Sequence, residues 1–207
     1  MATMDRPKID TIKIAEFWAW FSDNCDDFGV DFDNTELLSE LDKRIDRLGG
    51  FSWEIGPGIV KENALVISPG GDFDLLEESK RIVSGAKECA GWEFYYAKQP
   101  KQWELIFDFE TSDNKVVEVD GSQWEYVLLR YEDGLFEIII KAPDLSRFDE
   151  SDRITAAEIL LDGILGEEVR IQSICGIDVV EAFEKPYQER AGNIKNLSSH
   201  LKTLIKE

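Results

Sequence analysis

Apolar residues recur at helical spacing over the first fifty positions of the chain. Residues 13–22 and residues 34–48 each repeat a large apolar side chain every three or four positions, and Gly49-Gly50 follows the second stretch. This periodicity is typical of amphipathic helices, and a glycine pair is a common helix end. Residues 1–50 are therefore predicted to be a helical N-terminal segment with two helices.

Beyond position 50 the pattern changes mostly to an alternation of apolar and polar residues, which favours strands. Strands are predicted at residues 51–55, 64–68, 92–97, 103–109, 115–119, 123–131, 135–141 and 168–174. Helical spacing predicts further helices at residues 73–88, 151–165 and 186–207. The dipeptides Asp120-Gly121 and Asp133-Gly134 favour tight hairpin turns, so most strand pairs should be antiparallel.

Two runs of the same order, strand–strand–helix–strand, follow one another along the chain. Trp53-Glu54 stands at the start of the first run and Trp124-Glu125 at the start of the second. The repetition suggests internal duplication of a ββαβ unit, although such units are common. The sequence thus predicts an α+β fold with mostly antiparallel sheets, two N-terminal helices and one C-terminal helix. We expect a single compact domain over residues 1–207, with pseudo-repeated halves at about 51–98 and 123–175 joined by strands within 103–119.

The chain is strongly acidic. Its 207 residues include 43 Asp and Glu against 23 Lys and Arg, a formal net charge of -20, and its 43% of hydrophobic residues are enough for a substantial core. Nucleic acid and anionic membranes are poor partners because both require a positive surface. Only the predicted helix at residues 186–207 carries a net positive charge. We expect it to dock on the acidic body, or on a second copy in a homodimer.

Signals for export or membrane insertion are missing from the sequence pattern. No stretch reaches the roughly 18 consecutive apolar residues of a membrane span, and the N-terminus lacks the basic and apolar regions of a signal peptide. Cys25, Cys89 and Cys175 are odd in number and far apart, which fits reduced thiols. We therefore expect a cytoplasmic protein.

Three aromatic and apolar segments in the first half resemble a family of uncharacterised acidic bacterial cytosolic proteins. They are Phe17-Trp18-Ala19-Trp20-Phe21, Leu65-Val66-Ile67-Ser68, and Gly91-Trp92-Glu93-Phe94 leading to Lys98-Gln99-Pro100. These motifs are structural rather than catalytic. The resemblance implies a bacterial cytosolic α+β protein, and it implies no functional residue.

The acidic stretch between the first two helices contains a motif that matches a catalytic signature, but no catalytic residue is predicted there. Asp31-Phe32-Asp33-Asn34-Thr35 matches a phosphotransferase signature, but the residues before it are too polar for the buried strand that this chemistry requires. We expect Asp33 instead to cap the second helix, with Glu36 completing a capping box. The alternative metal ligands for metal-assisted hydrolysis are Asp23, Asp26, Asp27, Asp31 and Asp33, whose spacing does not fit a calcium loop. No cofactor is predicted.

Six tryptophans are many for a chain of this length. Most should pack in the core, but tryptophan is also a common anchor of protein recognition. Trp20, Trp92, Trp103 and Trp124 are the candidate binding residues. Together with the charge, they favour a non-enzymatic protein that binds a basic partner, of the type of an immunity protein or antitoxin. Metal-assisted hydrolysis is the alternative function, and solubility alone also accounts for the charge.

Overall fold

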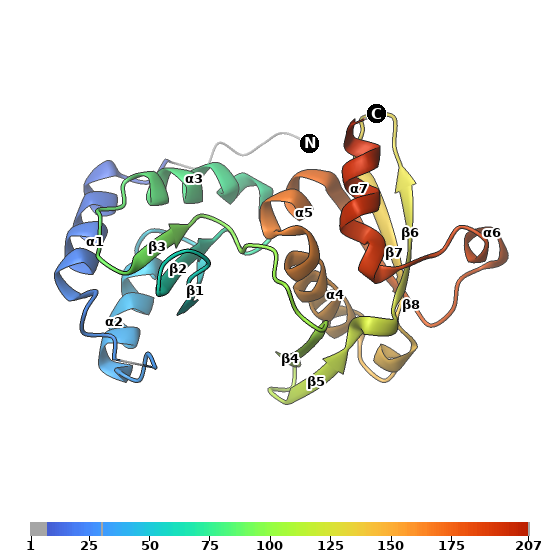
Figure 1. The fold of residues 1–207 in the computed structure, drawn as a ribbon, viewed down its shortest axis with the longest axis horizontal. Coiled ribbons are helices and arrows are strands. Elements are labelled where there is room, and N and C mark those ends of the chain that lie inside the picture. Colours follow the sequence, from blue (N-terminus) through green and yellow to red (C-terminus); the bar gives the residue numbers. More distant parts are fainter. Residues whose placement is uncertain (1–7, 30, 207) are drawn as a thin grey trace. The chain divides into compact units, whose positions relative to one another are not determined.

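The computed structural model describes residues 8–29 and 31–206, which form two compact units (Figure 1). Unit one ends at Lys98 and unit two begins at Gln99. Over the described residues the chain contains seven α-helices and nine strands, and four of the six strand pairings are antiparallel. The α+β class with mostly antiparallel sheets is therefore confirmed, whereas a single compact domain for the whole chain stays a prediction.

Unit one is a three-stranded sheet with three helices. Its elements are α1 (Thr11–Asn24), α2 (Thr35–Asp46), β1 (Ser52–Pro57), β2 (Asn63–Ser68), α3 (Phe73–Ser84) and β3 (Trp92–Tyr95). Strand β2 lies in the middle of the sheet, antiparallel to β1 and parallel to β3. The two predicted N-terminal helices are confirmed.

An aromatic core holds unit one together. Phe17, Trp18 and Phe21 project from one face of α1 and are at most 2% exposed. The Phe21 ring meets the ring of Trp92 on β3 edge to face, with 5.1 Å between centroids. The indole N–H of Trp92 donates to the carbonyl of Cys25 over 3.0 Å. Burial of this aromatic surface stabilises α1 against the sheet.

The N-cap of helix α2 is Asn34, one residue after the predicted N-cap Asp33. The side-chain oxygen of Asn34 accepts from the backbone N–H of Leu37 over 3.2 Å. The Asn34 amide also donates to the carbonyl of Asp27 over 2.8 Å and so ties the helix start to the preceding loop. An aspartate cannot do this, because a carboxylate has no hydrogen to donate. The predicted capping box of Asp33 and Glu36 is therefore wrong.

Unit two contains a two-stranded hairpin and a four-stranded sheet. The hairpin pairs β4 (Ile106–Glu110) with β5 (Val116–Asp120). The sheet has the order β8-β7-β6-β9 and consists of β6 (Glu125–Arg130), β7 (Phe136–Lys141), β8 (Ile174–Val180) and β9 (Gly192–Asn193). The helices are α4 (Glu150–Leu165), α5 (Glu167–Ser173), α6 (Lys185–Gln188) and α7 (Leu197–Lys206). In the described part of the chain, no helix combines the length and the apolar composition of a membrane span.

Side-chain alternation along β6 and β7 gives the larger sheet two covered faces. The residues of one face pack in the main core with apolar residues of α4 and α7. On the opposite face, Val127 and Ile139 form a smaller apolar cluster with Phe183. Successive strand residues point to opposite sides, so strands that are apolar at nearly every position require this double cover.

The two units share one ββαβ topology. In β1-β2-α3-β3 the first two strands are antiparallel and the third pairs parallel with the second, and β6, β7 and β8 pair in the same way, although two helices, α4 and α5, precede β8. The β6–β7 hairpin turns at Asp133-Gly134 as predicted, with Gly134 at a φ of 87°. The two tryptophans each donate to an aspartate over 2.9 Å, Trp53 to Asp42 and Trp124 to Asp144, but Trp53 is half-buried whereas Trp124 is buried. Internal duplication stays a prediction.

The predicted strand over residues 168–174 is wrong, because most of these residues form helix α5. The apolar residues on either side of Arg170 imitate a strand pattern. However, the Arg170 side chain is buried, and its Nε lies 2.5 Å from Oδ1 of Asp162 on α4. Gly166, at a φ of 83°, turns the chain so that α5 starts directly after α4. The strand of this region, β8, begins only at Ile174.

The predicted C-terminal helix over residues 186–207 is only partly correct. Helix α7 is present, whereas the residues before it form α6, β9 and a 3-10 turn. Gly192 and Asn193 pair with β6 and so interrupt the helix. The Asn193 side chain then accepts from the backbone N–H of Lys195 over 3.0 Å, which starts the 3-10 turn.

Candidate functional site

One face of the β4–β5 hairpin is acidic. Alternate residues of both strands point outward and are exposed, and four of these six are carboxylates. The outward residues form the acidic face of the hairpin: Ile106, Asp108, Glu110, Val116, Glu118 and Asp120. On the inward side, Phe109 and Val119 are 4% and 3% exposed in the main core. The core thus anchors the hairpin and leaves the carboxylates exposed to solvent.

The register of the hairpin places two carboxylates directly opposite each other. Asp108 pairs with Glu118 across the two strands, and like charges in this position destabilise a sheet. Among the described residues, neither strand pairs with a third one, so both edges carry unpaired backbone groups. The acidic face therefore opposes the stability of the hairpin that carries it.

Close packing at Gly121 fixes the open end of the hairpin. A Cβ at Gly121 would lie 2.5 Å from Cδ1 of Leu160 on α4, and the Gly121 N–H donates to the carbonyl of Leu105 over 2.9 Å. The Asp120 side chain accepts from the backbone N–H of Ser122 over 2.9 Å and starts a 3-10 turn. The chain then enters β6 in the other sheet, so the hairpin turn predicted at Asp120-Gly121 is wrong.

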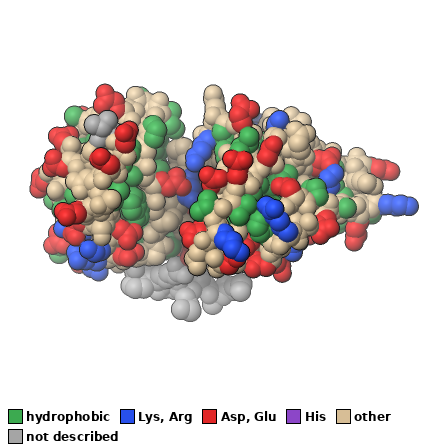
Figure 2. Space-filling view, turned by 90° about the horizontal axis from the view of Figure 1, so that it is seen from below, with side chains coloured by type: hydrophobic (Ala, Val, Ile, Leu, Met, Phe, Trp, Pro, Cys, Tyr) green, Lys and Arg blue, Asp and Glu red, His purple; other side chains and the backbone are tan. Residues whose placement is uncertain are grey.

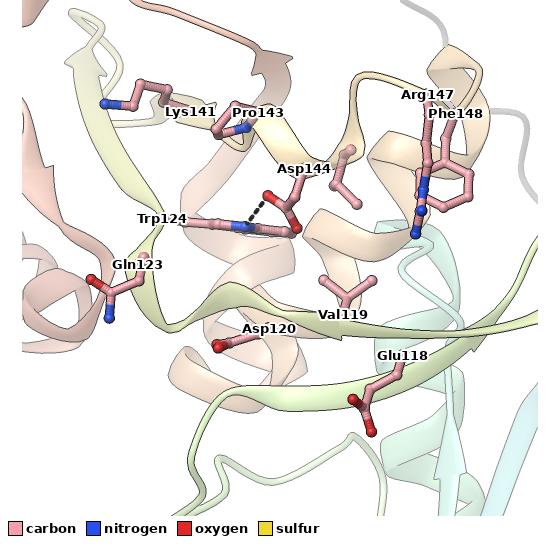
Figure 3. Close-up of a pocket in the computed structure, with 11 residues that line it drawn as sticks. Glu118, Val119, Asp120, Gln123, Trp124, Lys141, Pro143, Asp144, Arg147 and Phe148 are labelled. Carbon is pink, nitrogen blue, oxygen red and sulfur yellow. Dashed lines mark hydrogen bonds between the residues drawn. The ribbon is translucent and has the colours of Figure 1, made fainter.

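A groove of about 410 Å³ opens beside β5 (Figure 3). It is lined by Glu118, Val119 and Asp120, by Gln123 and Trp124 of the following turn, by Lys141 at the end of β7, and by Pro143, Asp144, Leu145, Arg147 and Phe148 of the segment between β7 and α4. Trp124 is 2% exposed, and its indole N–H donates to Oδ1 of Asp144 over 2.9 Å. This bond orients the Asp144 carboxylate. The groove and the acidic face are continuous, because Glu118 and Asp120 belong to both.

The charges that line the groove are unequal. Three carboxylates line it together with two cations, Lys141 and Arg147. The Lys141 ammonium is ion-paired with Glu125 on the neighbouring strand β6. The Arg147 guanidinium lies over the ring of Phe148, with 4.7 Å from Cζ to the ring centroid. Because Lys141 is neutralised locally, the groove keeps an excess of negative charge.

The Asp120 carboxyl is held in its ionised form. The largest effect is the hydrogen bond that it accepts from the Ser122 side chain, followed by the one from the Ser122 backbone N–H. The positive charge of Lys195 also favours the ionised carboxylate. These interactions favour the carboxylate, so the pKa of Asp120 lies below the ordinary aspartate value. Asp120, which like Glu118 belongs to both the acidic face and the groove, is therefore negative throughout the neutral pH range.

The four candidate tryptophans are divided between the two units. In unit one, Trp92 is 2% exposed in the core, and the half-buried Trp20 has the Cζ of Arg44 at 4.5 Å from its ring centroid. In unit two, Trp103 is half-buried and packs against α4. Of the four, only Trp124 lines the groove.

The five candidate metal ligands between α1 and α2 are exposed side chains of a loop and its borders: Asp23, Asp26, Asp27, Asp31 and Asp33. In residues 8–29 and 31–206, no three His, Cys, Asp or Glu side chains are grouped so that they could hold a metal ion, and this includes the acidic face. Figure 2 shows Asp and Glu side chains spread over the face in view, with Lys and Arg between them. The arrangement of the charge on the hairpin, rather than its amount, distinguishes the candidate site.

Sequence reasoning missed both the acidic face and the groove. A signal for the face is present, because acids occupy every second position in residues 108–110 and again in residues 118–120. Such alternation on a strand places them on one side. The groove has no comparable signal, because Trp124 and Asp144 are 20 positions apart and meet only through the fold.

Comparisons of the chain with protein family models, with curated proteins and with solved structures gave no match. The fold and the site define an α+β protein of two compact units, the second of which carries an acidic hairpin face beside an acidic groove. Functional inference therefore rests on this site.

Proposed function

We propose that the protein binds a basic partner protein through the acidic face and the groove, in the manner of an immunity protein that neutralises a cationic toxin. The observation that carries the proposal is the directly opposed pair of Asp108 and Glu118. Two like charges that lower the stability of their own hairpin become favourable when a cation binds between them. The expected setting, the bacterial cytoplasm, rests on the resemblance of the aromatic motifs in the first half.

The groove suits a lysine or arginine side chain of the partner. Apolar lining from Val119, Leu145 and Phe148 can cover the alkyl stem, while the charged end group meets carboxylates at the rim. The Asp144 carboxylate is already oriented by Trp124, so little side-chain entropy is lost when it accepts a hydrogen bond from the partner. The acidic face next to the groove would then meet further basic residues.

The long-range field supports the same proposal. A net charge of -20 attracts a cationic partner before contact and accelerates association, most strongly at low ionic strength. A toxin that acts on nucleic acid needs a basic surface for its phosphate contacts. An acidic protein that covers this surface blocks the toxin by charge complementarity.

Protection of the hairpin edges is the competing explanation for the carboxylates. Charged side chains on unpaired strands prevent edge-to-edge association. This role requires neither an adjoining groove nor a particular sign of charge. Under it, neutralising the face causes self-association, which size-exclusion chromatography detects, and leaves binding of a basic partner unchanged.

Capture from a native lysate at low and high salt tests the proposal. The face variant is Asp108→Asn, Glu110→Gln, Glu118→Gln and Asp120→Asn. The control variant neutralises four exposed acids of unit two outside the face and the groove: Glu132→Gln, Glu181→Gln, Glu184→Gln and Glu189→Gln. Both variants change the net charge equally. The wild type and the control should capture the same basic protein at low salt, and the face variant should not.

Three results would overturn the proposal. They are capture of no basic protein by the wild type, equal loss of capture in both variants, and undiminished capture by the face variant. A further variant, which removes a positive charge from the groove, should strengthen binding instead of weakening it. Among the described residues Arg147 has no carboxylate partner, and it repels an incoming cation. Arg147→Gln should therefore strengthen binding of the captured protein, and weaker binding would place the contact outside the groove.

A further inference from the structure

A second pocket, of about 290 Å³, lies between α1 and α2 in unit one. Its lining residues are Lys13, Glu16 and Phe17 of α1, and Arg44, Arg47 and Leu48 at the end of α2. Glu16 and Phe17 lie three and four residues after Lys13, and Arg47 and Leu48 lie three and four residues after Arg44, so each group shares one side of its helix. Phe17 and Leu48, at 2% and 5% exposed, form an apolar floor.

The charge of this pocket is opposite to that of the chain. Three of its six lining residues are cations, in a protein whose net charge is -20. Lys13 and Arg47 are exposed and form no ion pair within the described residues. Glu16 supplies the only carboxylate among the six lining residues. The pocket therefore keeps a local excess of positive charge.

The Arg44 guanidinium is held in a fixed position at the pocket. Its Cζ lies 4.5 Å from the ring centroid of Trp20, and its Nε lies 2.8 Å from Oε1 of Glu40. The Trp20 contact covers one planar face of the guanidinium, and the buried Nε is close to Glu40 but forms no hydrogen bond within the described residues. The two terminal nitrogens form no hydrogen bond with any described residue and present a planar pair of donors, the geometry that binds a carboxylate or phosphate oxygen pair.

From this geometry we infer that the pocket between α1 and α2 binds a small oxyanion, a carboxylate or a phosphate monoester, attached to a compact apolar group. Arg44 supplies the fixed donors, while Lys13 and Arg47 close around the anion from the two helices. The apolar group rests on Phe17 and Leu48. The inference is independent of the proposed function, because it concerns a different unit, different residues and a ligand of opposite charge.

Titration with benzoate and with phenyl phosphate, followed in 1H–15N NMR spectra, tests the inference. Binding should shift the indole N–H signal of Trp20 and the backbone signals of residues 13–17 and 44–48. We expect a dissociation constant of about 1 mM or lower for at least one probe. The tighter probe identifies the oxyanion. Benzyl alcohol, which keeps the aromatic ring without the charge, should not bind.

The principal variant is Lys13→Gln with Arg47→Gln, because both side chains are exposed and their loss should leave the fold intact. It should weaken binding by about tenfold or more. Arg44→Lys keeps the charge but loses the paired donors, so it should also weaken binding. Lys43→Gln removes an exposed cation of α2 outside the pocket, so it is the control for charge on this helix and should bind as the wild type.

Two outcomes would contradict the inference. The first is binding of neither probe by the folded wild type. The second is equal affinity in the wild type and the double variant, which would mean that the probes bind elsewhere. A signal change spread over surface amides without saturation counts as the first outcome, because it reports only weak association with scattered cations. Failure of this test would leave the basic-partner proposal unaffected.

Discussion

Reversing one charge of the opposed pair should stabilise the protein and abolish its binding of a basic partner. In Asp108→Lys the repulsion between position 108 and Glu118 becomes an attraction, because the two residues are direct partners across β4 and β5. The same change inverts one of the four charges on the acidic face. A gain in stability together with a loss of function distinguishes a binding surface from a structural one.

The size of the expected gain in stability follows from the register of β4 and β5. Side chains directly opposite in an antiparallel pair have Cβ atoms roughly 4.5–5.5 Å apart, and unit charges in water interact by about 1 kcal/mol at 4 Å. Both carboxylates are exposed, so solvent and salt reduce the pair energy to about 0.3 kcal/mol. Changing its sign gives a gain of about 0.6 kcal/mol for Asp108→Lys.

A double-mutant cycle with Glu118→Lys isolates this energy from the different strand propensities of Asp and Lys. Each single variant makes an attractive pair, whereas the double variant restores repulsion between two lysines. The expected coupling energy is about 1 kcal/mol at low salt. The assay is urea unfolding followed by circular dichroism, repeated at 1 M salt, where the screening length of about 3 Å should remove most of the coupling.

A coupling energy of zero at low salt would refute the reasoning, because the two carboxylates would then not repel each other in the folded chain. A coupling that persists at 1 M salt would assign it to side-chain packing instead of charge. If Asp108→Lys is more stable and still captures the basic partner, the face is not the binding surface. Urea midpoints must be compared at unchanged slope, since a changed slope means that the unfolding reaction itself has changed.

Three further predictions concern the fold and its titrating groups. Asp162→Asn should lower the free energy of unfolding by about 3 kcal/mol, because it leaves the buried Arg170 guanidinium without its nearest carboxylate. Urea unfolding measures this loss, and a value below about 1 kcal/mol would contradict the prediction. Cys175 is exposed and should react with a thiol reagent in the native state, whereas burial raises the pKa of Cys89 to about 12 and should prevent its reaction until the chain unfolds, as peptide mass spectrometry will show. Because the pKa of Asp120 is lowered in the folded protein, this carboxylate contributes stability above the ordinary aspartate pKa, and the contribution is lost as the pH falls through the folded-state pKa. An NMR titration of the Asp120 carboxyl should give a midpoint below that of an ordinary aspartate.

Local sequence patterns predicted most of the elements. The helical spacing before position 50 and the alternation after it correspond to α1, α2 and to the strands from β1 to β7. These patterns are reliable where a segment is long and its buried side is continuous. The Asp133-Gly134 turn was also predictable, because Gly134 adopts a positive φ that a hairpin of this kind requires.

Several errors arose where a contact between different elements decided the structure. Helix α5 imitates a strand pattern, and the deciding feature is the ion pair of Arg170 with Asp162, eight residues earlier in a different helix. Asp120-Gly121 has the composition of a hairpin turn, but its glycine packs against Leu160 of α4. The groove similarly depends on a bond between Trp124 and Asp144. None of these contacts produces periodicity, so pattern analysis alone could not find them.

The positions of the acidic residues distinguish a role in binding from a role in solubility, whereas the net charge alone does not. If solubility were the only role of the excess acids, any exposed position would serve equally well, and positions that oppose folding would be the least favourable. Asp108 and Glu118 occupy such positions, on a hairpin whose edges are unpaired among the described residues. The two explanations therefore predict different results for the same variants. Under solubility alone, neutralising the acidic face and neutralising the control acids have equal effects, whereas under binding only the face variant loses the partner.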